Sequence, residues 1–293
     1  MSDSTTALEA TNAAAPAPVP APEPEPAPRP APEHTLTGDI RTHEGFHSRF
    51  LEHDRTVTVY LPPGYETDHR VRRYPVLYLH DGQNVFDRAT SVGEEWRVDE
   101  TAQEMIEAGT MAPIIAVGIW NTGVHRIDEY APTPRPDKGG GGKADDYGKM
   151  LVQELKPFID RTYRTLPGAG NTAMGGSSLG GLLTMHLGLR YPTVFSKLAV
   201  LSPSVWWDDR VIIREVEALP GKLPVKVWLD AGDREGEDVL TDARALKGAL
   251  VTKGWTEGAD LAYLEAEGGE HNEASWAARI GAVFAYLFPP VKG

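Results

Sequence analysis

The sequence predicts an α/β fold with a mainly parallel, twisted sheet and helices on both faces. Short apolar runs, each long enough for a buried strand, alternate along the chain with longer segments whose apolar residues recur at helical spacing. Polar or glycine-rich turns separate the two kinds of segment. Such alternation is typical of parallel strands joined by crossover helices, which cover both faces of the sheet.

The expected elements follow one another in a regular order. Strands are expected at 56–61, 75–79, 113–119, 171–175, 197–201, 224–229 and 260–264. Helices are expected at 99–108, 145–163, 182–189 and 273–287. In the longest helix, one face is formed by Met150, Leu151, Leu155, Phe158 and Ile159.

The N-terminal segment, residues 1–35, differs from the rest in composition. It consists mainly of alanine, proline and glutamate, with proline at every second position from Pro16 to Pro32. Such a segment lacks a hydrophobic core, so we expect a disordered or polyproline-like tail. It lacks a basic start followed by an apolar run, which favours a cytoplasmic protein over a secreted one. Residues 36–293 are enough for one catalytic domain.

Composition excludes several classes of partner. The net charge of -13 argues against nucleic acid, whose phosphates would be repelled. No apolar run approaches the roughly 20 residues of a membrane helix. The absence of cysteine excludes disulfides and thiolate metal sites. We expect a small-molecule substrate and neither a cofactor nor a metal, and the pattern indicates no particular oligomeric state.

The pentapeptide Gly176-Ser177-Ser178-Leu179-Gly180 has the pattern G-x-S-x-G between a predicted strand and a predicted helix. A sharp strand-to-helix turn needs residues without bulk, and the two outer glycines supply that room. Ser178, with glycine two positions before and after it, is the predicted nucleophile, and Ser177 fills the intervening position. The helix begins at Ser178, so its free N–H groups point at the reacting centre. A glycine-rich turn without a nucleophile is the alternative.

A nucleophilic serine needs a base, and His271 is the predicted base. In this arrangement the residues follow in the order serine, acid, histidine. Of the nine histidines only His271 lies beyond the turn and outside its helix. It stands in a glycine-rich loop, 267–272, which would let the imidazole reach back over the sheet. The alternative is a surface histidine.

The acid that orients the base is expected in the loop after strand 224–229. An acid there would lie at the carboxyl end of a strand, where α/β sheets place their sites. The candidates are Asp230, Asp233, Glu235 and Asp238. The alternative is a solvated loop that caps the next helix, with Glu237 and Asp238 near its N-terminus.

Two backbone amides are predicted to form an oxyanion hole. One belongs to Leu179, the residue after the nucleophile, and the other to Gln83, in the loop after strand 75–79. Gly82 allows a close backbone approach there. We expect His80 and Asp81 to satisfy buried backbone groups rather than to take part in catalysis.

Tryptophans near strand ends are the predicted substrate contacts. Trp120 ends one strand and Trp206 follows another, with Trp96 and Trp207 as further indoles nearby. Two or more of them facing the cleft would form a flat wall suited to an aromatic or sugar-bearing ester. The alternative is that each indole belongs to the rim of the core.

The segment 123–145, with three prolines and the run of glycines at 139–142, is expected to be a mobile flap beside the site. Arg126 in this segment could bind an acidic or catecholate substrate. The alternative is that it pairs with Asp128 or Glu129.

Five stretches together resemble the esterase family that contains esterase D, enterochelin (siderophore) esterases, and feruloyl and acetylxylan carbohydrate esterases. They are LYLHDGQNVFD at 77–87, GGSSLGG at 175–181, RYPTVF at 190–195, SPSVWW at 202–207 and GEHNE at 269–273. The resemblance runs from about Thr37 to the C-terminus, and the enterochelin-esterase-like branch is the most similar. It implies an α/β-hydrolase fold and serine ester hydrolysis without a cofactor.

The resemblance also bears on the acid. In this branch an acidic residue lies three positions after a glycine that ends the strand, and Gly232 plus three is Glu235. Many relatives have aspartate at that position, so Asp233 and Asp238 stay open as alternatives.

Three functional hypotheses follow. The first is a serine carboxylic-ester hydrolase that works through Ser178, His271 and Glu235 and an acyl-enzyme. The second is an acyltransferase with the same site, in which an alcohol replaces water. The third is a non-catalytic binding module of the same fold, against which the complete set of three residues argues.

Overall fold

The computed structural model describes residues 33–67 and 72–290. The predicted tail, residues 1–35, therefore lies almost entirely outside the described residues. Its last three residues are described, and two of them, His34 and Thr35, contact Asp87. His34 Nδ1 lies 2.7 Å from one carboxylate oxygen, and the amide of Thr35 donates to the other at 3.2 Å.

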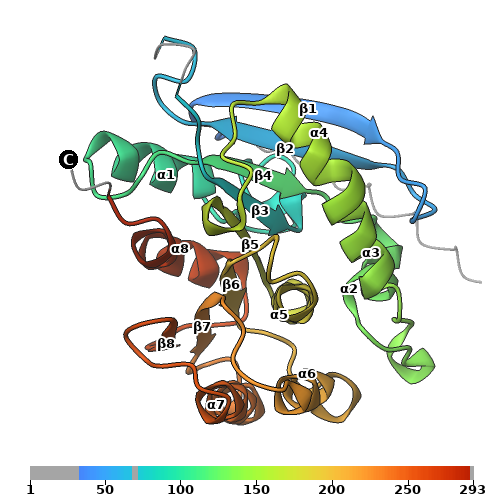
Figure 1. Ribbon diagram of the computed structural model, residues 1–293. Helices are drawn as coiled ribbons and strands as arrows, with labels where there is room; N and C mark the ends of the chain where they lie inside the picture. Colours follow the sequence, from blue (N-terminus) through green and yellow to red (C-terminus); the bar gives the residue numbers. More distant parts are fainter. Residues whose placement is uncertain (1–32, 68–71, 291–293) are drawn as a thin grey trace, which may run out of the picture. The chain divides into compact units, whose positions relative to one another are not determined.

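One eight-stranded sheet lies at the centre of the described residues 33–290 (Figure 1). The strand order is β1-β2-β4-β3-β5-β6-β7-β8. β2 pairs antiparallel with β1 and β4, and the remaining pairs are parallel, so the prediction of a mainly parallel sheet is confirmed. The strands are β1 (Asp39–Phe46), β2 (Arg55–Leu61), β3 (Val76–His80), β4 (Ile115–Ile119), β5 (Thr172–Ser177), β6 (Lys197–Leu201), β7 (Lys226–Gly232) and β8 (Leu261–Ala266).

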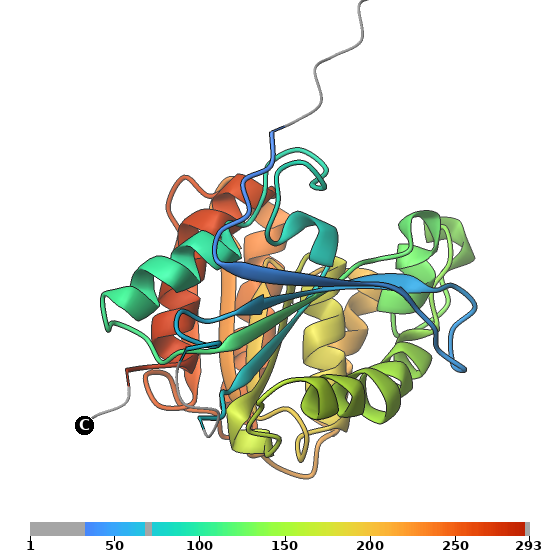
Figure 2. The same cartoon turned by 90° about the horizontal axis from the view of Figure 1, so that it is seen from above.

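Helices cover both faces of this sheet, as Figures 1 and 2 show. Side chains of α1 and α8 fill the core on one face, and those of α3 to α7 fill the core on the other. The α-helices are α1 (Val98–Glu107), α2 (Arg126–Tyr130), α3 (Ala144–Met150), α4 (Lys156–Thr162), α5 (Leu179–Arg190), α6 (Trp207–Ala218), α7 (Glu237–Thr252) and α8 (Glu273–Leu287). Short 3₁₀ turns lie at η1 (Gly82–Asn84), η2 (Gly123–His125), η3 (Pro136–Lys138) and η5 (Ala169–Asn171).

The predicted strands and helices are present, with two differences in detail. The helix expected at 145–163 is α3, a π-helical turn η4 (Leu151–Leu155), and α4. The π turn ends two residues before Pro157, which has no N–H to donate to the helix. The segment 123–145, expected to be a flap, contains α2 and is anchored by buried Tyr130 and by the hydrogen bond from the Gly141 amide to Asp128.

The carboxyl ends of the parallel strands bring the functional loops together. Ser177 at the end of β5 is in register with Leu201 at the end of β6, which is in register with Asp230 in β7. The residues that follow these strands therefore meet at one edge of the sheet. Within the described ranges, no helix is long and apolar enough to cross a bilayer.

Candidate active site

Ser178 stands at a strained turn between β5 and α5. Its φ of 57° and ψ of -123° are unusual for a residue with a side chain. The amide of Ser178 donates to the carbonyl of Leu201 at 3.1 Å, and its own carbonyl accepts from Ser204 at 3.0 Å. A Cβ on Gly176 would lie 2.9 Å from the backbone of Gly180, so the turn requires glycine there. These contacts hold the serine in the geometry of a nucleophile elbow.

His271 and Glu235 form a hydrogen-bonded pair beside this turn. His271 Nδ1 lies 2.7 Å from Glu235 Oε2, and the Glu235 side chain has no exposed surface. The other oxygen of Glu235 accepts hydrogen bonds from Ser202 Oγ at 2.6 Å and from the Gly232 amide at 2.7 Å. Burial opposes ionisation of this carboxyl, but the hydrogen bonds from His271, Ser202 and Gly232 hold the pKa of Glu235 below its ordinary value.

The other three acidic candidates have different partners. Asp230 is fully buried and bonds to Trp228 Nε1 at 2.7 Å and to Arg279 at 3.2 Å. Asp233 accepts the amide of Gly268 at 2.7 Å, and Asp238 is exposed at the start of α7. The geometry therefore pairs His271 with Glu235.

A cavity of about 390 Å³ joins the predicted residues from four parts of the chain. Most of the residues that line it are polar or charged: Asp81, Gln83, Asn84, Asn121, Arg126, Ser177, Ser178, His271 and Glu273, with Val92, Gly123, Trp96 and Trp276. The Ser178 hydroxyl lies 3.4 Å from Ser204 Oγ and makes no hydrogen bond with His271 within the described chain. Catalytic hydrogen bonds are often formed only when substrate is bound, so this geometry is compatible with a serine–histidine pair.

Two backbone amides beside the cavity are free to bind an anion. Within the part of the chain that the structure describes, the N–H groups of Leu179 and Gln83 have no hydrogen-bond acceptor. Gln83 is held in place because its side-chain oxygen accepts the amide of Asn121 at 3.1 Å. A Cβ on Gly82 would collide with the backbone of Gly118 in β4, so only glycine fits at the start of this loop.

Arg126 lines the cavity, but its charge is already paired. Its guanidinium donates to both oxygens of Asp81, at 2.6 and 2.8 Å. Burial alone would raise the pKa of Asp81, and the charge and hydrogen bonds of Arg126 lower it instead. The expected pairing with Asp128 or Glu129 is wrong. Glu129 instead pairs with the buried Arg55, with both oxygens at 3.1 Å.

A second carboxyl faces the cavity at the first turn of α8. Glu273 accepts a hydrogen bond from the Asn84 amide group at 3.1 Å. Burial raises the pKa of Glu273, and the nearby charge of Asp81 adds to this effect. The cavity thus contains two carboxyls and one guanidinium.

The two predicted tryptophans, Trp120 and Trp206, do not form a wall at this cavity. Trp120 donates to Thr58 Oγ1 at 3.0 Å and lines a separate cavity of about 60 Å³. Trp206 is 48% exposed and lines another hollow beside α7. The indoles in the cavity that Ser178 lines are those of Trp96 and Trp276, of which Trp276 packs edge-on against His271 at 5.1 Å between ring centroids.

His80 serves a structural purpose. It is fully buried, its Nδ1 lies 3.0 Å from the Tyr147 hydroxyl, and burial lowers its pKa to about 3. Its ring also lies against the serine turn, since a Cβ on Gly176 would lie 3.0 Å from it.

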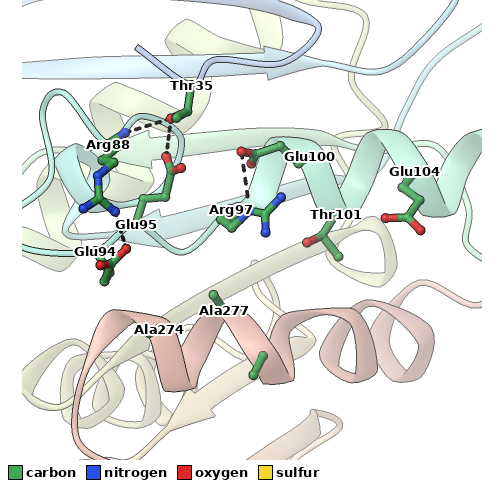
Figure 3. A pocket seen from close by; sticks show the side chains of 11 residues that line it. Thr35, Arg88, Glu94, Glu95, Arg97, Glu100, Thr101, Glu104, Ala274 and Ala277 are labelled. Carbon is green, nitrogen blue, oxygen red and sulfur yellow. Dashed lines mark hydrogen bonds and ion pairs between the residues drawn. The ribbon is translucent and has the colours of Figure 1, made fainter. Parts of the chain in front are cut away.

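A larger cavity, about 620 Å³, lies between α1 and α8 and contains none of the predicted residues (Figure 3). Its charged side chains are Arg88, Glu94, Glu95, Arg97, Glu100 and Glu104. Both arginines are paired with glutamates, Arg88 with Glu94 and Arg97 with Glu100. Among the residues in the described ranges, no three His, Asp or Glu side chains are grouped as metal ligands would be.

The family is decided by comparison with known proteins. The model of the family described as Putative esterase matches residues 48–287. The chain belongs to this family. Of the relatives, the uncharacterized protein YbbA of Bacillus subtilis is 26% identical over 235 residues, which cover 76% of this chain and 85% of that protein. An endo-1,4-beta-xylanase/feruloyl esterase of Xylanibacter ruminicola is 29% identical over 80% of this chain but only 29% of its own length.

Solved structures of other proteins share the fold. The enterobactin esterase FES from Shigella flexneri superimposes with a TM-score of 0.70 at 20% identity, over 86% of this chain and 59% of that chain. The BES protein from Bacillus cereus gives a TM-score of 0.68 at 19% identity, over 87% of this chain and 97% of that one. The chain has the α/β-hydrolase fold, and its family makes it a carboxylic ester hydrolase.

The sequence did not point to every residue around the site. Ser202, Asn84 and Glu273 lie inside stretches that resemble the family, but no chemical pattern assigned them a role. Arg279 is an arginine on an otherwise apolar face of α8, and this isolated charge was the available signal for a buried ion pair.

Proposed function

We propose that this esterase hydrolyses small, aromatic or sugar-linked esters through Ser178, His271 and Glu235. The observation that carries the proposal is the pair of His271 and buried Glu235, 2.7 Å apart, at the cavity that Ser178 also lines. The positive φ of Ser178 supports its role, because strain of this kind is typical of functional residues.

In the proposed first step, Ser178 Oγ attacks the ester carbonyl while His271 Nε2 takes its proton. Glu235 holds the proton of His271 on Nδ1, so that Nε2 is free to act as base, and stabilises the imidazolium that forms. The amides of Leu179 and Gln83 donate to the oxyanion. The imidazolium then protonates the departing alcohol, which leaves an acyl-enzyme on Ser178.

In the second step, His271 takes a proton from water, which attacks the acyl carbonyl. The same two amides stabilise the second oxyanion, and as it collapses the His271 imidazolium returns the proton to Ser178 Oγ, which releases the acid and regenerates the free enzyme. Feruloyl and siderophore esters are candidate substrates, because relatives carry those names.

A p-nitrophenyl ester series from acetate to octanoate, together with a fluorophosphonate probe, tests the proposal. We expect wild type to hydrolyse the short esters and to be labelled, and Ser178→Ala to do neither while it unfolds at the same temperature. The matched variant Ser177→Ala should keep its labelling. Hydrolysis by Ser178→Ala would exclude this nucleophile. Absence of labelling in folded wild type would favour a binding module.

A further inference from the structure

Behind Glu235 lies a buried polar cluster that the proposed mechanism does not use. Ser202, Asp230 and Arg279 are each at most 5% exposed. They come from three elements: Ser202 follows β6, Asp230 lies in β7 and Arg279 lies on α8. Buried charges are costly unless they are paired, so their arrangement around Glu235 calls for a physical reason.

The Ser202 hydroxyl is the centre of this cluster. It donates to Glu235 Oε1 at 2.6 Å and accepts from Trp276 Nε1 at 3.0 Å and from Arg279 Nη2 at 2.9 Å. The indole and the guanidinium are donors only, so the single proton of the hydroxyl must point at Glu235. Ser202 also has a positive φ of 40°, which the surrounding bonds maintain.

Arg279 lies between two carboxylates and is closer to one of them. Its Nη2 is 3.2 Å from Asp230 Oδ1 and 3.6 Å from Glu235 Oε1. Asp230 is fixed in that position by the Trp228 indole at 2.7 Å and the Ser202 amide at 3.2 Å. Burial raises the pKa of Asp230 to about 6, so above that pH its carboxylate balances the charge of Arg279. The charge of Glu235 then remains for His271.

We propose that Asp230 is a positioning residue of this esterase. It holds the Arg279 guanidinium and so preserves the negative charge of Glu235 for His271. The inference rests on the proposed function. Positive charge develops on His271 when it takes the proton of Ser178, and an unbalanced guanidinium behind Glu235 would oppose that step.

The proposal predicts opposite shifts in the acid limb of the kcat/KM–pH profile, which reports protonation of the base. Asp230→Asn keeps the shape but removes a negative charge, so His271 protonates less readily and the midpoint should fall by about half a pH unit. Arg279→Gln should raise the midpoint. The double variant Asp230→Asn/Arg279→Gln restores the net charge, and its midpoint should return to that of wild type.

The remaining charged groups around His271 are unchanged in these variants. Glu270 precedes it in the chain, Glu273 lies on α8, and Asp81 and Arg126 face it across the cavity. They therefore affect wild type and variants alike.

Asp242→Asn provides a matched control. Asp242 is another nearly buried aspartate with an arginine partner, Arg210 at 2.6 Å, but it lies on α7 outside the cluster. Its replacement should leave the acid limb in place even where it lowers the unfolding temperature.

The proposal is overturned if the acid-limb midpoints of Asp230→Asn and of Arg279→Gln both equal the midpoint of wild type and of Asp242→Asn. If Asp230→Asn does not fold, an unchanged midpoint in Arg279→Gln has the same meaning. Failure of the proposed function is distinguishable, because wild type would then show no hydrolysis that depends on Ser178.

Discussion

Replacement of Glu235 by glutamine tests the proposed acid–base pair, because the neighbouring donors decide which way the new amide would face. Glu235 Oε1 accepts two hydrogen bonds, from Ser202 Oγ and from the Gly232 amide. An amide N–H cannot donate to the N–H of Gly232, so the glutamine oxygen must occupy this position. The NH₂ group is then placed opposite His271 Nδ1, 2.7 Å away.

This orientation would reverse the tautomer of His271. With an N–H donor opposite it, Nδ1 must accept, so the proton of the neutral ring moves to Nε2, the nitrogen that should act as base. In a serine protease the corresponding aspartate-to-asparagine change lowers kcat by about 10⁴-fold through the same effect. We therefore expect Glu235→Gln to lower kcat/KM about 10⁴-fold, or about 5.4 kcal/mol at 1.36 kcal/mol for each factor of ten.

The assay is hydrolysis of p-nitrophenyl acetate near neutral pH, with Asp233→Asn as the matched control. Asp233 accepts the amide of Gly268, and the oxygen of asparagine can accept the same bond, so its effect should stay within about threefold. A larger loss in Asp233→Asn than in Glu235→Gln would move the acid to Asp233. Retention of more than about a tenth of the activity by Glu235→Gln would refute the tautomer argument.

Three further predictions concern the oxyanion loop, the acid stability and the charge of the cavity. Gly82→Ala should lower kcat about 10²-fold, because the new Cβ meets the backbone of Gly118 and displaces the Gln83 amide. An unchanged kcat would exclude the Gln83 amide as an oxyanion donor. The hydrogen bond from His186 lowers the pKa of Asp145 to about 2. The stabilisation by this ion pair is therefore present above the ordinary pKa of Asp145 and lost as pH falls toward 2. The higher Tm of wild type over Asp145→Asn should vanish near pH 2, and a Tm difference that stays constant with pH would contradict this. Mono-p-nitrophenyl succinate carries a negative charge that p-nitrophenyl butyrate lacks. Glu273→Gln should raise the ratio of the rate on the succinate to the rate on the butyrate about threefold at low salt. The same ratio in wild type and in the variant would show that the charge of Glu273 has no influence on the choice of ester.

The central fold could be predicted because parallel strands buried on both faces leave a continuous apolar signal. The strand at 76–80 and the strand at 115–119 are apolar almost throughout, and every residue in them is buried. The edge strand β1 gave no such signal, because its residues are half-buried or exposed and largely polar. The start of α6 was equally hidden, since three of its first residues, 208–210, have positive φ.

The positions of Ser178 and His271 at one cavity could be anticipated from local signals. A glycine-flanked turn and the order of residues along the chain are properties of the sequence itself. The partner of Arg126 could not be anticipated in this way, because Asp81 lies 45 residues earlier and meets it only through the sheet. The same holds for Asp230 in β7 and Arg279 on α8, which lie 49 positions apart in the sequence and meet only in the folded chain.

If the cavity is the active site, as proposed, recognition of the substrate should depend more on hydrogen bonds than on an aromatic wall. The indoles of Trp96 and Trp276 are at most 5% exposed, and the Trp276 N–H is already used by Ser202. The guanidinium of Arg126 is likewise occupied by Asp81, so the described residues that line the cavity include no unpaired guanidinium or ammonium group for a polyanionic ester. Polar groups on the loops after β3 and β4 and on the first turn of α8 remain as the contacts for substrate. We therefore expect polar changes in these segments to alter the choice of ester more than changes at Trp120 or Trp206, which line other cavities.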